Sequence, residues 1–275
     1  MSVEDTSSAD VTATGPVGYV EYEINVEKVL RAELPGKLGE VEVAPLTEEA
    51  IAALPARAKG AYVLYEDGIA VYAGKTDASH GFRDRLRRHS YTIQHRHGFD
   101  YSRIGFKAAR ILVFSNFDVE AILIKELRRQ DKKALAWNNS GFGSNDVGHG
   151  RERQRPSPFD VQRPINIDRP LPFLDPGEVS LLRLLVVLKN SLPYDFRYET
   201  DLDHKGDPVD YRKGHVDQRD APSVVIPPED LTCRKVLALV LAALPSGWRV
   251  TVFPGRLILY KEDEAYRFAL EYIAG

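Results

Sequence analysis

The order of apolar and polar positions predicts four elements in the first half of the chain. Residues 60–74 hold two β-rich runs around a Glu-Asp-Gly turn, the pattern of a β-hairpin. Residues 82–94 place apolar side chains at helical spacing with arginines between them, which predicts a helix. Residues 107–114 are a third strand candidate. A helix is predicted over 119–129, because a Ser-Asn-Phe-Asp capping signature precedes this apolar run.

The second half begins with prolines at 156, 158, 164, 170, 172 and 176, which predict an extended linker that is poor in helix. Beyond it, the patterns predict helices over 179–192 and 231–244 and a hairpin over 248–261 around a Pro-Gly turn. Residues 262–274 are predicted to form a closing helix.

Together these elements predict an α+β protein. We expect a disordered tail over 1–17, a segment over 18–56 that packs onto the next domain, and that first domain over 57–160. A proline-rich linker over 161–176 then leads to a second, small α+β domain over 177–275.

Composition narrows the class of protein. A hydrophobic fraction of 43% and a charged fraction of 28% are ordinary for a soluble globular chain. The only cysteine is Cys233, which excludes a disulfide framework and a cysteine-rich zinc site. The longest apolar run, 236–244, is too short to span a membrane, and the first residues lack the order of a secretory signal. A cytoplasmic protein is expected.

The net charge of −3 is unevenly distributed. Residues 1–56 carry 3 basic and 11 acidic residues, whereas residues 57–155 carry 19 basic and 11 acidic ones. A basic middle between acidic ends is typical of a domain that binds a polyanion, although local charge of this size also arises by chance. Residues 176–275 hold 13 basic and 15 acidic residues, which does not favour a primary DNA-binding role for that part.

Five side chains in the first domain are candidates for chemistry. Tyr62 and Tyr72 lie on partner strands of the hairpin, where sheet packing alone also explains tyrosines. Arg85 and His89 are four residues apart and share a helix face. The alternative is that this face is simply exposed to solvent. Glu120 lies in the first turn of its helix, where a carboxylate is favoured by the helix dipole in any case.

The glycine-rich loop over 139–155 combines amides with three arginines and is a candidate for lying along DNA; the alternative is a flexible basic loop. The residues that we assign to DNA binding are Lys75, Arg88, Asn145, His149, Arg151 and Arg153. His80, His95 and His97 have no cysteine or carboxylate at metal-ligand spacing, so we expect solvated histidines rather than a zinc site.

The spacing of these motifs resembles the GIY-YIG nuclease superfamily, and within it the type II restriction endonuclease branch. The resemblance covers residues 57–160. Its motifs in this chain are GAY at 60–62, VYAG at 71–74, RLRRH at 85–89, VEAILIK at 119–125, WN at 137–138, GFGSN at 141–145 and GHGR at 148–151.

The resemblance implies a nuclease core, a small antiparallel sheet flanked by helices, that hydrolyses a phosphodiester by in-line attack of water with one divalent cation, Mg²⁺ or Mn²⁺. Glu120 would be the metal ligand and Arg85 would hold a phosphate oxygen. Tyr62 would be the general base, assisted by His89 or Tyr72, with Lys75 as one cation that could lower its pKa.

Asn138 would orient Tyr62 or the substrate by hydrogen bonding. Three features depart from the family pattern: Ala61 replaces the isoleucine of the family name, the hairpin turn is short, and the segment before Asn138 is long and basic. The region 177–275 has no counterpart in the resemblance.

The function expected from the resemblance is sequence-specific cleavage of double-stranded DNA at a short GC-rich palindrome, by a homodimer whose host sites a DNA methyltransferase protects. The sequence leaves two alternatives open. One is a structure-specific or repair nuclease, and the other is a DNA-binding module without catalysis.

Overall fold

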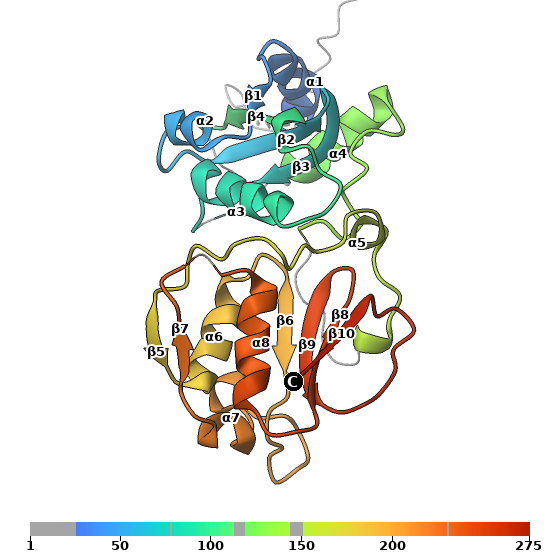
Figure 1. Cartoon of the computed structure of the whole chain (residues 1–275). Coiled ribbons are helices and arrows are strands. Elements are labelled where there is room, and N and C mark those ends of the chain that lie inside the picture. Colours follow the sequence, from blue (N-terminus) through green and yellow to red (C-terminus); the bar gives the residue numbers. More distant parts are fainter. Residues whose placement is uncertain (1–25, 78, 113–118, 144–150, 230) are drawn as a thin grey trace, which may run out of the picture.

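The computed structural model describes residues 26–77, 79–112, 119–143, 151–229 and 231–275. The predicted tail and the capping signature before residue 119 lie outside these residues. The chain is α+β, with small, mainly antiparallel sheets and helices arranged in two lobes (Figure 1). We call residues 26–143 the N-terminal lobe and residues 165–275 the C-terminal lobe.

The N-terminal lobe is built on an antiparallel sheet of order β1-β4-β2-β3. Strands β2 (Gly60–Glu66) and β3 (Ile69–Lys75) form the predicted hairpin. Its turn residues Asp67 and Gly68 both have positive φ, 53° and 77°, which matches the twist of the strands. This prediction is confirmed.

The third predicted strand is only partly correct. Strand β4 (Ile104–Arg110) begins before the predicted segment and ends within it. The reason is pairing, because β4 is matched residue for residue with β2, from Gly60 opposite Arg110 to Glu66 opposite Ile104. The short strand β1 (Ala44–Pro45) pairs with β4 on its other side.

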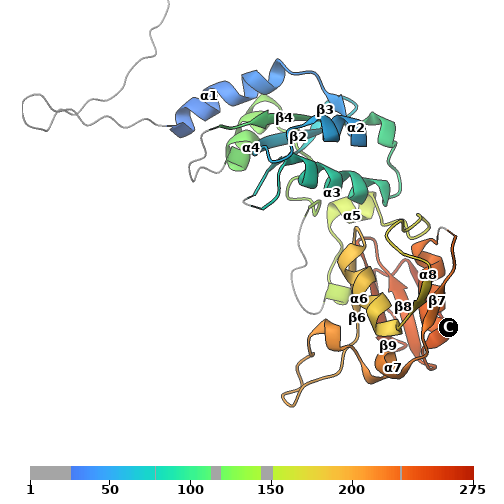
Figure 2. The same cartoon turned by 90° about the vertical axis from the view of Figure 1, so that its left-hand side faces the viewer.

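Helices cover both faces of this sheet (Figure 2). Helix α3 (Phe82–Gln94) and helix α2 (Glu48–Ala53) share one core cluster with the side chains of Tyr62 and Leu64. Helices α1 (Val26–Gly39) and α4 (Val119–Gln130) pack on the opposite face, against Ala61 and Val63. The alternation of side chains along β2 therefore directs Tyr62 toward α3.

The C-terminal lobe has its own core around a sheet of order β10-β8-β9-β6. The helices predicted over 179–192 and 231–244 and the hairpin predicted over 248–261 are confirmed. Its elements are β5 (Gly177–Val179), α6 (Leu181–Ser191), β6 (Asp195–Tyr198), α7 (Val216–Asp220), β7 (Val224–Ile226), α8 (Cys233–Ala243), β8 (Trp248–Val252) and β9 (Arg256–Lys261).

The predicted closing helix over 262–274 is wrong. The chain ends instead in strand β10 (Glu271–Ala274), which pairs antiparallel with β8. Tyr266, before this strand, packs against Phe253 and Ile258. Helix propensities differ by only about 0.7 kcal/mol per residue, so pairing with the open edge of β8 and burial of Tyr266 outweigh them.

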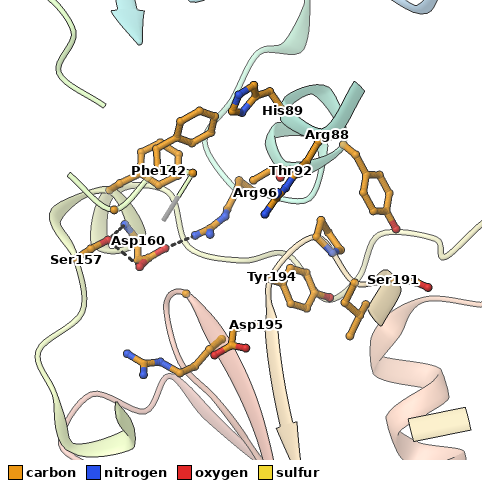
Figure 3. Close-up of a pocket in the computed structure, with 18 of the residues that line it drawn as sticks. Arg88, His89, Thr92, Arg96, Phe142, Ser157, Asp160, Ser191, Tyr194 and Asp195 are labelled. Carbon is orange, nitrogen blue, oxygen red and sulfur yellow. Dashed lines mark hydrogen bonds and ion pairs between the residues drawn. The ribbon is translucent and has the colours of Figure 1, made fainter. Parts of the chain in front are cut away.

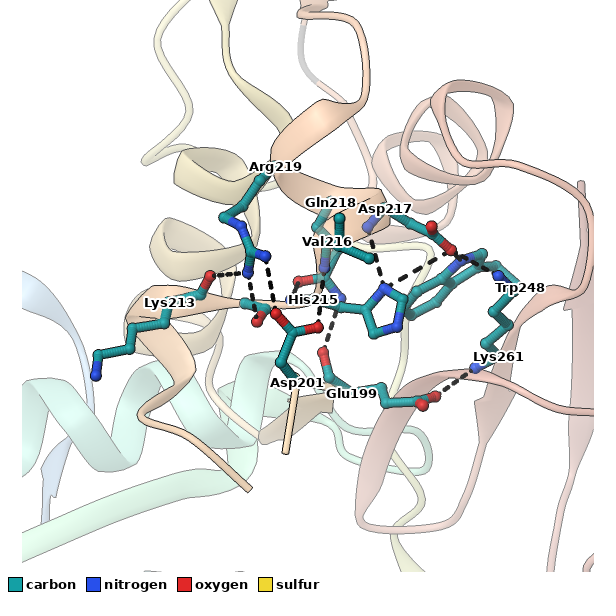
Figure 4. A network of polar contacts seen from close by, with 11 residues as sticks. Glu199, Asp201, Lys213, His215, Val216, Asp217, Gln218, Arg219, Trp248 and Lys261 are labelled. Carbon is teal, nitrogen blue, oxygen red and sulfur yellow. Dashed lines mark hydrogen bonds and ion pairs between the residues drawn. The ribbon is translucent and has the colours of Figure 1, made fainter. Parts of the chain in front are cut away.

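A polar network fixes α7 to the C-terminal sheet (Figure 4). The Nδ1 atom of His215 accepts a hydrogen bond from the backbone of Asp217 at 3.1 Å and so caps the helix. The Asp217 carboxylate in turn accepts from the indole of Trp248 at 2.8 Å and from Lys261 at 2.9 Å. These polar groups satisfy one another, which indicates a structural role.

The segment over 161–176, predicted as a linker, is extended after the short helix α5 (Pro158–Gln162), yet it packs on the C-terminal lobe. Ile165, Ile167 and Leu171 are each 3% exposed and belong to the core of that lobe. Apolar residues between the prolines are the signal that distinguishes such a segment from a free linker.

Arg96, just beyond α3, ties the two lobes together. Its Nη1 atom donates to the Asp160 carboxylate at 2.7 Å, to the carbonyl of Arg163 at 3.0 Å and to that of Pro254 at 3.4 Å. The guanidinium is 8% exposed and the Asp160 side chain 19%. The pair therefore holds α3, α5 and the β8–β9 turn in one arrangement.

Replacing Arg96 with methionine should lower the free energy of unfolding by about 3 kcal/mol, because the half-buried Asp160 carboxylate loses its partner. Urea denaturation of full-length protein measures the change. The matched control is Arg103→Met, which breaks an exposed pair with Asp67 and should cost less than about 1 kcal/mol. Equal losses in the two variants would contradict a structural role for Arg96.

Candidate active site

The hairpin register places Tyr62 directly opposite Gly74. A Cβ atom at Gly74 would lie 2.6 Å from the Tyr62 hydroxyl and 2.9 Å from a ring carbon of Tyr72. Contacts this short are not tolerated, so position 74 requires glycine where the Tyr62 ring crosses the strand. This explains why the two tyrosines and the glycine of the motif belong together.

Helix α3 completes the centre of the site with His89. The Tyr62 hydroxyl lies 2.8 Å from the Nε2 atom of His89. The ring of Tyr72 lies 5.1 Å from that of His89, Phe142 stacks on the imidazole at 5.1 Å, and Tyr72 and Phe142 also touch each other at 5.1 Å. Tyr62 is 0% exposed and His89 5%, so the pair is shielded from water.

The buried rings are held in their neutral forms. Burial, with the positive charges of Arg85 and Arg88, lowers the pKa of His89 to about 3. Burial also raises the pKa of Tyr62 and of Tyr72. At neutral pH the phenol of Tyr62 is therefore the donor, Nε2 of His89 is the acceptor, and the imidazole proton is on Nδ1.

Arg85 brings a positive charge to the two phenols. Burial alone would lower its pKa, but the oxygens of Tyr62 and Tyr72 and the carboxylate of Asp77 raise it. Asp77 lies 4.0 Å from the guanidinium and was not among the predicted site residues. Its signal in the sequence is its position just after the β3 strand that carries Tyr72.

Glu120 belongs to the same site, in the first turn of α4. Its negative charge raises the pKa of both Tyr62 and Tyr72, after burial and other nearby groups. Helices α3 and α4 pack on opposite faces of the sheet, yet Arg85 of α3 and Glu120 of α4 both act on the two phenols of the hairpin.

A carboxylate with phenolic oxygens nearby suits Mg²⁺, which binds few protein ligands and keeps several waters. Within the described residues, no group of three His, Cys, Asp or Glu side chains could hold a metal.

Asn138 has a different role from the one expected. Its side chain is 8% exposed, and it accepts from the backbone N–H of Ala73 at 2.8 Å and donates to the carbonyl of Ala73 at 2.9 Å. It does not hydrogen bond to Tyr62. Together with the backbone of Leu135 and Trp137, which donate to β3, it closes the edge of the sheet. Asn138 therefore positions β3, and with it Tyr72.

The residues assigned to DNA binding are spread over several places. Lys75 is half-buried at the end of β3, and Arg88 is exposed on α3. Arg153 is exposed but forms an ion pair with Glu264 of the C-terminal lobe at 3.0 Å. Asn145 and His149 lie outside the described residues, as does the side chain of Arg151.

Among the three histidines expected to be solvated, His95 is an exception. It is 5% exposed, and its ring nitrogens lie 3.0 Å from the carbonyl of Tyr91 and 3.3 Å from that of Pro170. Its hydrogen bonds to segments far apart in the sequence explain the burial. His80 and His97 are exposed, as expected.

A cavity of about 970 Å³ opens beside the site, between α3 and the C-terminal lobe (Figure 3). Arg85, His89 and Phe142 belong to its wall, so the cavity borders the buried rings. Among the described residues that line it, seven are arginine or lysine and two are aspartate. An anion is therefore favoured inside it.

No model of a known protein family matches the chain, and no curated protein is similar to it. Within the described part, no helix is long and apolar enough to cross a membrane. The geometry of the site is therefore the guide to its chemistry.

Gly74→Ala should displace the Tyr62 ring, break its hydrogen bond to His89 and cost about 1–3 kcal/mol of stability, because the added methyl group overlaps both tyrosines. Denaturant unfolding and the near-ultraviolet circular dichroism of tyrosine report the change. The control is Gly36→Ala in α1, where an added Cβ meets nothing within 4 Å. A Gly74→Ala protein with unchanged stability and tyrosine signal would refute the packing requirement.

The low pKa of His89 predicts a pH dependence of stability. The folded protein resists protonation of His89 down to pH about 3, whereas the unfolded chain protonates it near the ordinary pKa of 6.5. Stability due to this group is complete above pH 6.5 and is lost as the pH falls, by up to about 1.4 kcal/mol per pH unit.

Denaturant titrations between pH about 4.5 and about 7.5, a range that spans the titration of an unfolded histidine, should therefore give a shallower acid-side slope for His89→Gln than for the wild type. His97→Gln, which removes an exposed imidazole, should keep the wild-type slope. Parallel slopes for His89→Gln and the wild type would show that folding does not lower the pKa of His89.

Proposed function

We propose that the protein is a metal-dependent DNA endonuclease of the GIY-YIG type, with Tyr62, Tyr72, Arg85, His89 and Glu120 as its active site. The observation that carries this proposal is the 2.8 Å hydrogen bond from the Tyr62 hydroxyl to His89, beside Arg85. A buried phenol that donates to a neutral imidazole is a ready path for a proton, and an adjacent guanidinium suits a phosphate.

Arg85, Tyr62 and His89 divide the chemistry among them. Arg85 holds a non-bridging oxygen of the scissile phosphodiester. Tyr62 accepts a proton from the attacking water while its own proton passes to Nε2 of His89. The hydroxyl group bonds to phosphorus as one ester P–O bond breaks, and the leaving alkoxide takes a proton from solvent. The products are a phosphomonoester and an alcohol.

Substrate binding favours this proton transfer. Arg85 is the largest electrostatic cause of the low His89 pKa after burial, and Arg88 is the next. A phosphate anion between these cations offsets their charge, which raises the basicity of His89 when the water must be deprotonated. The site is thus unreactive until an anionic substrate arrives.

Glu120 is the residue that would hold Mg²⁺ or Mn²⁺, since its carboxylate is a hard oxygen ligand close to both phenols. When bound, the ion supplies stabilisation of negative charge on the phosphate and the leaving oxygen. The positive charge of Arg85 and the negative charge of Glu120 would then lie beside the same substrate.

The finer part of the proposal rests on the motifs over 57–160. They favour a type II restriction endonuclease that cuts duplex DNA at a short GC-rich palindrome as a homodimer, with a cognate DNA methyltransferase in the same system. The antiparallel sheet with helices on both faces and the clustering of the five side chains support a GIY-YIG core. The C-terminal lobe would be a second domain.

Glu120→Gln should reduce cleavage of plasmid DNA in the presence of Mg²⁺ by about 10²-fold or more, because the amide keeps the shape but loses the charge that favours a cation. Gel electrophoresis of timed digests measures this. The matched control, Glu178→Gln, removes an exposed carboxylate on β5 and should cut like the wild type.

Discrete fragments from the wild type that disappear with Glu120→Gln are the expected result. Cleavage confined to branched or flapped DNA would replace restriction with a repair activity. Absence of cleavage of any DNA, with Mg²⁺ or Mn²⁺, would overturn the proposed function.

A further inference from the structure

Both walls of the cavity between the lobes carry positive charge. Arg85 and Arg88 of α3 line the N-terminal wall, and Lys189 of α6 and Arg256 of β9 line the C-terminal one. Figure 3 shows Arg88 on its side of the cavity. Arg155, from the segment between the lobes, is exposed at the cavity. Four segments that are distant in the sequence thus place basic side chains around one cavity.

The two carboxylates in the cavity are outnumbered by the seven arginines and lysines that line it. Asp160 is paired with Arg96 at 2.7 Å, and Asp195 lies 3.7 Å from Arg197. Arg88 and Arg155, in contrast, have no carboxylate within 4 Å among the residues that the structure describes. A cleft with an excess of one sign of charge and protein on two sides concentrates counter-ions of the other sign.

The cavity is continuous with the proposed active site. Arg85, Arg88 and Thr92 recur at three- and four-residue spacing along α3 and so lie on one face of the helix, which borders the cavity. Arg85 belongs to both places. A strand whose scissile phosphate is held at Arg85 has its neighbouring phosphates along this face.

We propose that the C-terminal lobe is the second wall of a DNA cleft, in which the sugar–phosphate backbone of one substrate strand runs from Arg85 into the cavity and contacts Lys189 and Arg256. This rests on the proposed function. A volume of about 970 Å³ holds a segment of one strand and not the width of a duplex. The Lys189 ammonium donates to the carbonyl of Phe196 at 3.0 Å and lies 5.4 Å from the centre of the Tyr211 ring, so it would contact phosphate with the N–H groups that these partners do not use.

Contacts to the DNA backbone predict a particular pattern of changes in binding. Phosphates are the same at every position, so contacts to them fix the register of the strand without reading bases. Loss of Lys189 and Arg256 should weaken binding to every sequence by a similar factor. It should also reduce the dependence of binding on salt, by about 0.9 in the slope of log K against log [salt] for each phosphate that is no longer neutralised.

The test uses full-length protein in a Glu120→Gln background, which prevents cleavage, and two labelled DNA duplexes of unrelated sequence. Fluorescence anisotropy at several salt concentrations gives the affinities and the salt slopes. Lys189→Gln with Arg256→Gln should weaken both duplexes at least about tenfold and reduce the slope by about two. Lys235→Gln with Arg183→Gln, which removes equal charge from exposed sites of the same lobe outside the cavity, should change neither quantity.

A charge-conserving variant, Lys189→Arg with Arg256→Lys, separates loss of charge from loss of fold and should keep most of the affinity. Unchanged binding by the glutamine variant would overturn the cleft, and so would weakening that is confined to one sequence. Equal weakening by the glutamine and charge-conserving variants would also overturn it.

The two proposals fail separately. If the protein with its native Glu120 cuts DNA but the cavity variants bind DNA as tightly as the parent protein does, only the proposal of a second wall is wrong. If the cavity variants lose affinity equally for both duplexes while the protein with Glu120 cuts nothing, the cleft stands and the proposed catalysis fails. Absence of DNA binding by the parent protein would overturn both.

Discussion

The close approach of Tyr62 to Gly74 is the constraint on which the site depends. Because strands β2 and β3 are in register at this pair, the phenol crosses the partner strand where no Cβ atom stands in its way. From there it reaches His89 on α3 at 2.8 Å. The two hydrogen bonds between Asn138 and Ala73 hold the edge strand in that register, so a residue that does not contact Tyr62 still helps to determine its position.

Electrostatics determines the protonation states in this packed arrangement. Two phenols and an imidazole are buried in neutral form, and the charges of Arg85, Arg88 and Glu120 act on them. Burial makes each charge effective, since little water screens it. A phosphate that enters near Arg85 therefore changes the proton affinity of His89, and a cation beside Glu120 would change that of the phenols. In the proposed reaction, binding and proton transfer would therefore be coupled through the same few groups.

The two lobes are joined through buried polar contacts rather than through a flexible connection. Arg96 and Asp160 link α3 to the turn between β8 and β9, and the segment after α5 is part of the C-terminal core. This arrangement keeps Lys189 and Arg256 facing α3 across the cavity. A lobe whose composition is slightly acidic can thus present a basic wall, because position and not net charge decides what a surface attracts.

The sequence by itself determined the elements with strong local signals: the hairpin with its Asp-Gly turn, helices α3, α4, α6 and α8, and the motif residues Tyr62, Tyr72, Arg85, His89 and Glu120. Periodicity and turn chemistry are local, so these predictions needed no tertiary contacts. Only the tertiary structure decided that the chain ends in β10, that Asn138 binds β3, that His95 is buried and that the C-terminal lobe faces the site. Each depends on partners distant in the sequence, and pairing with them outweighs local propensity.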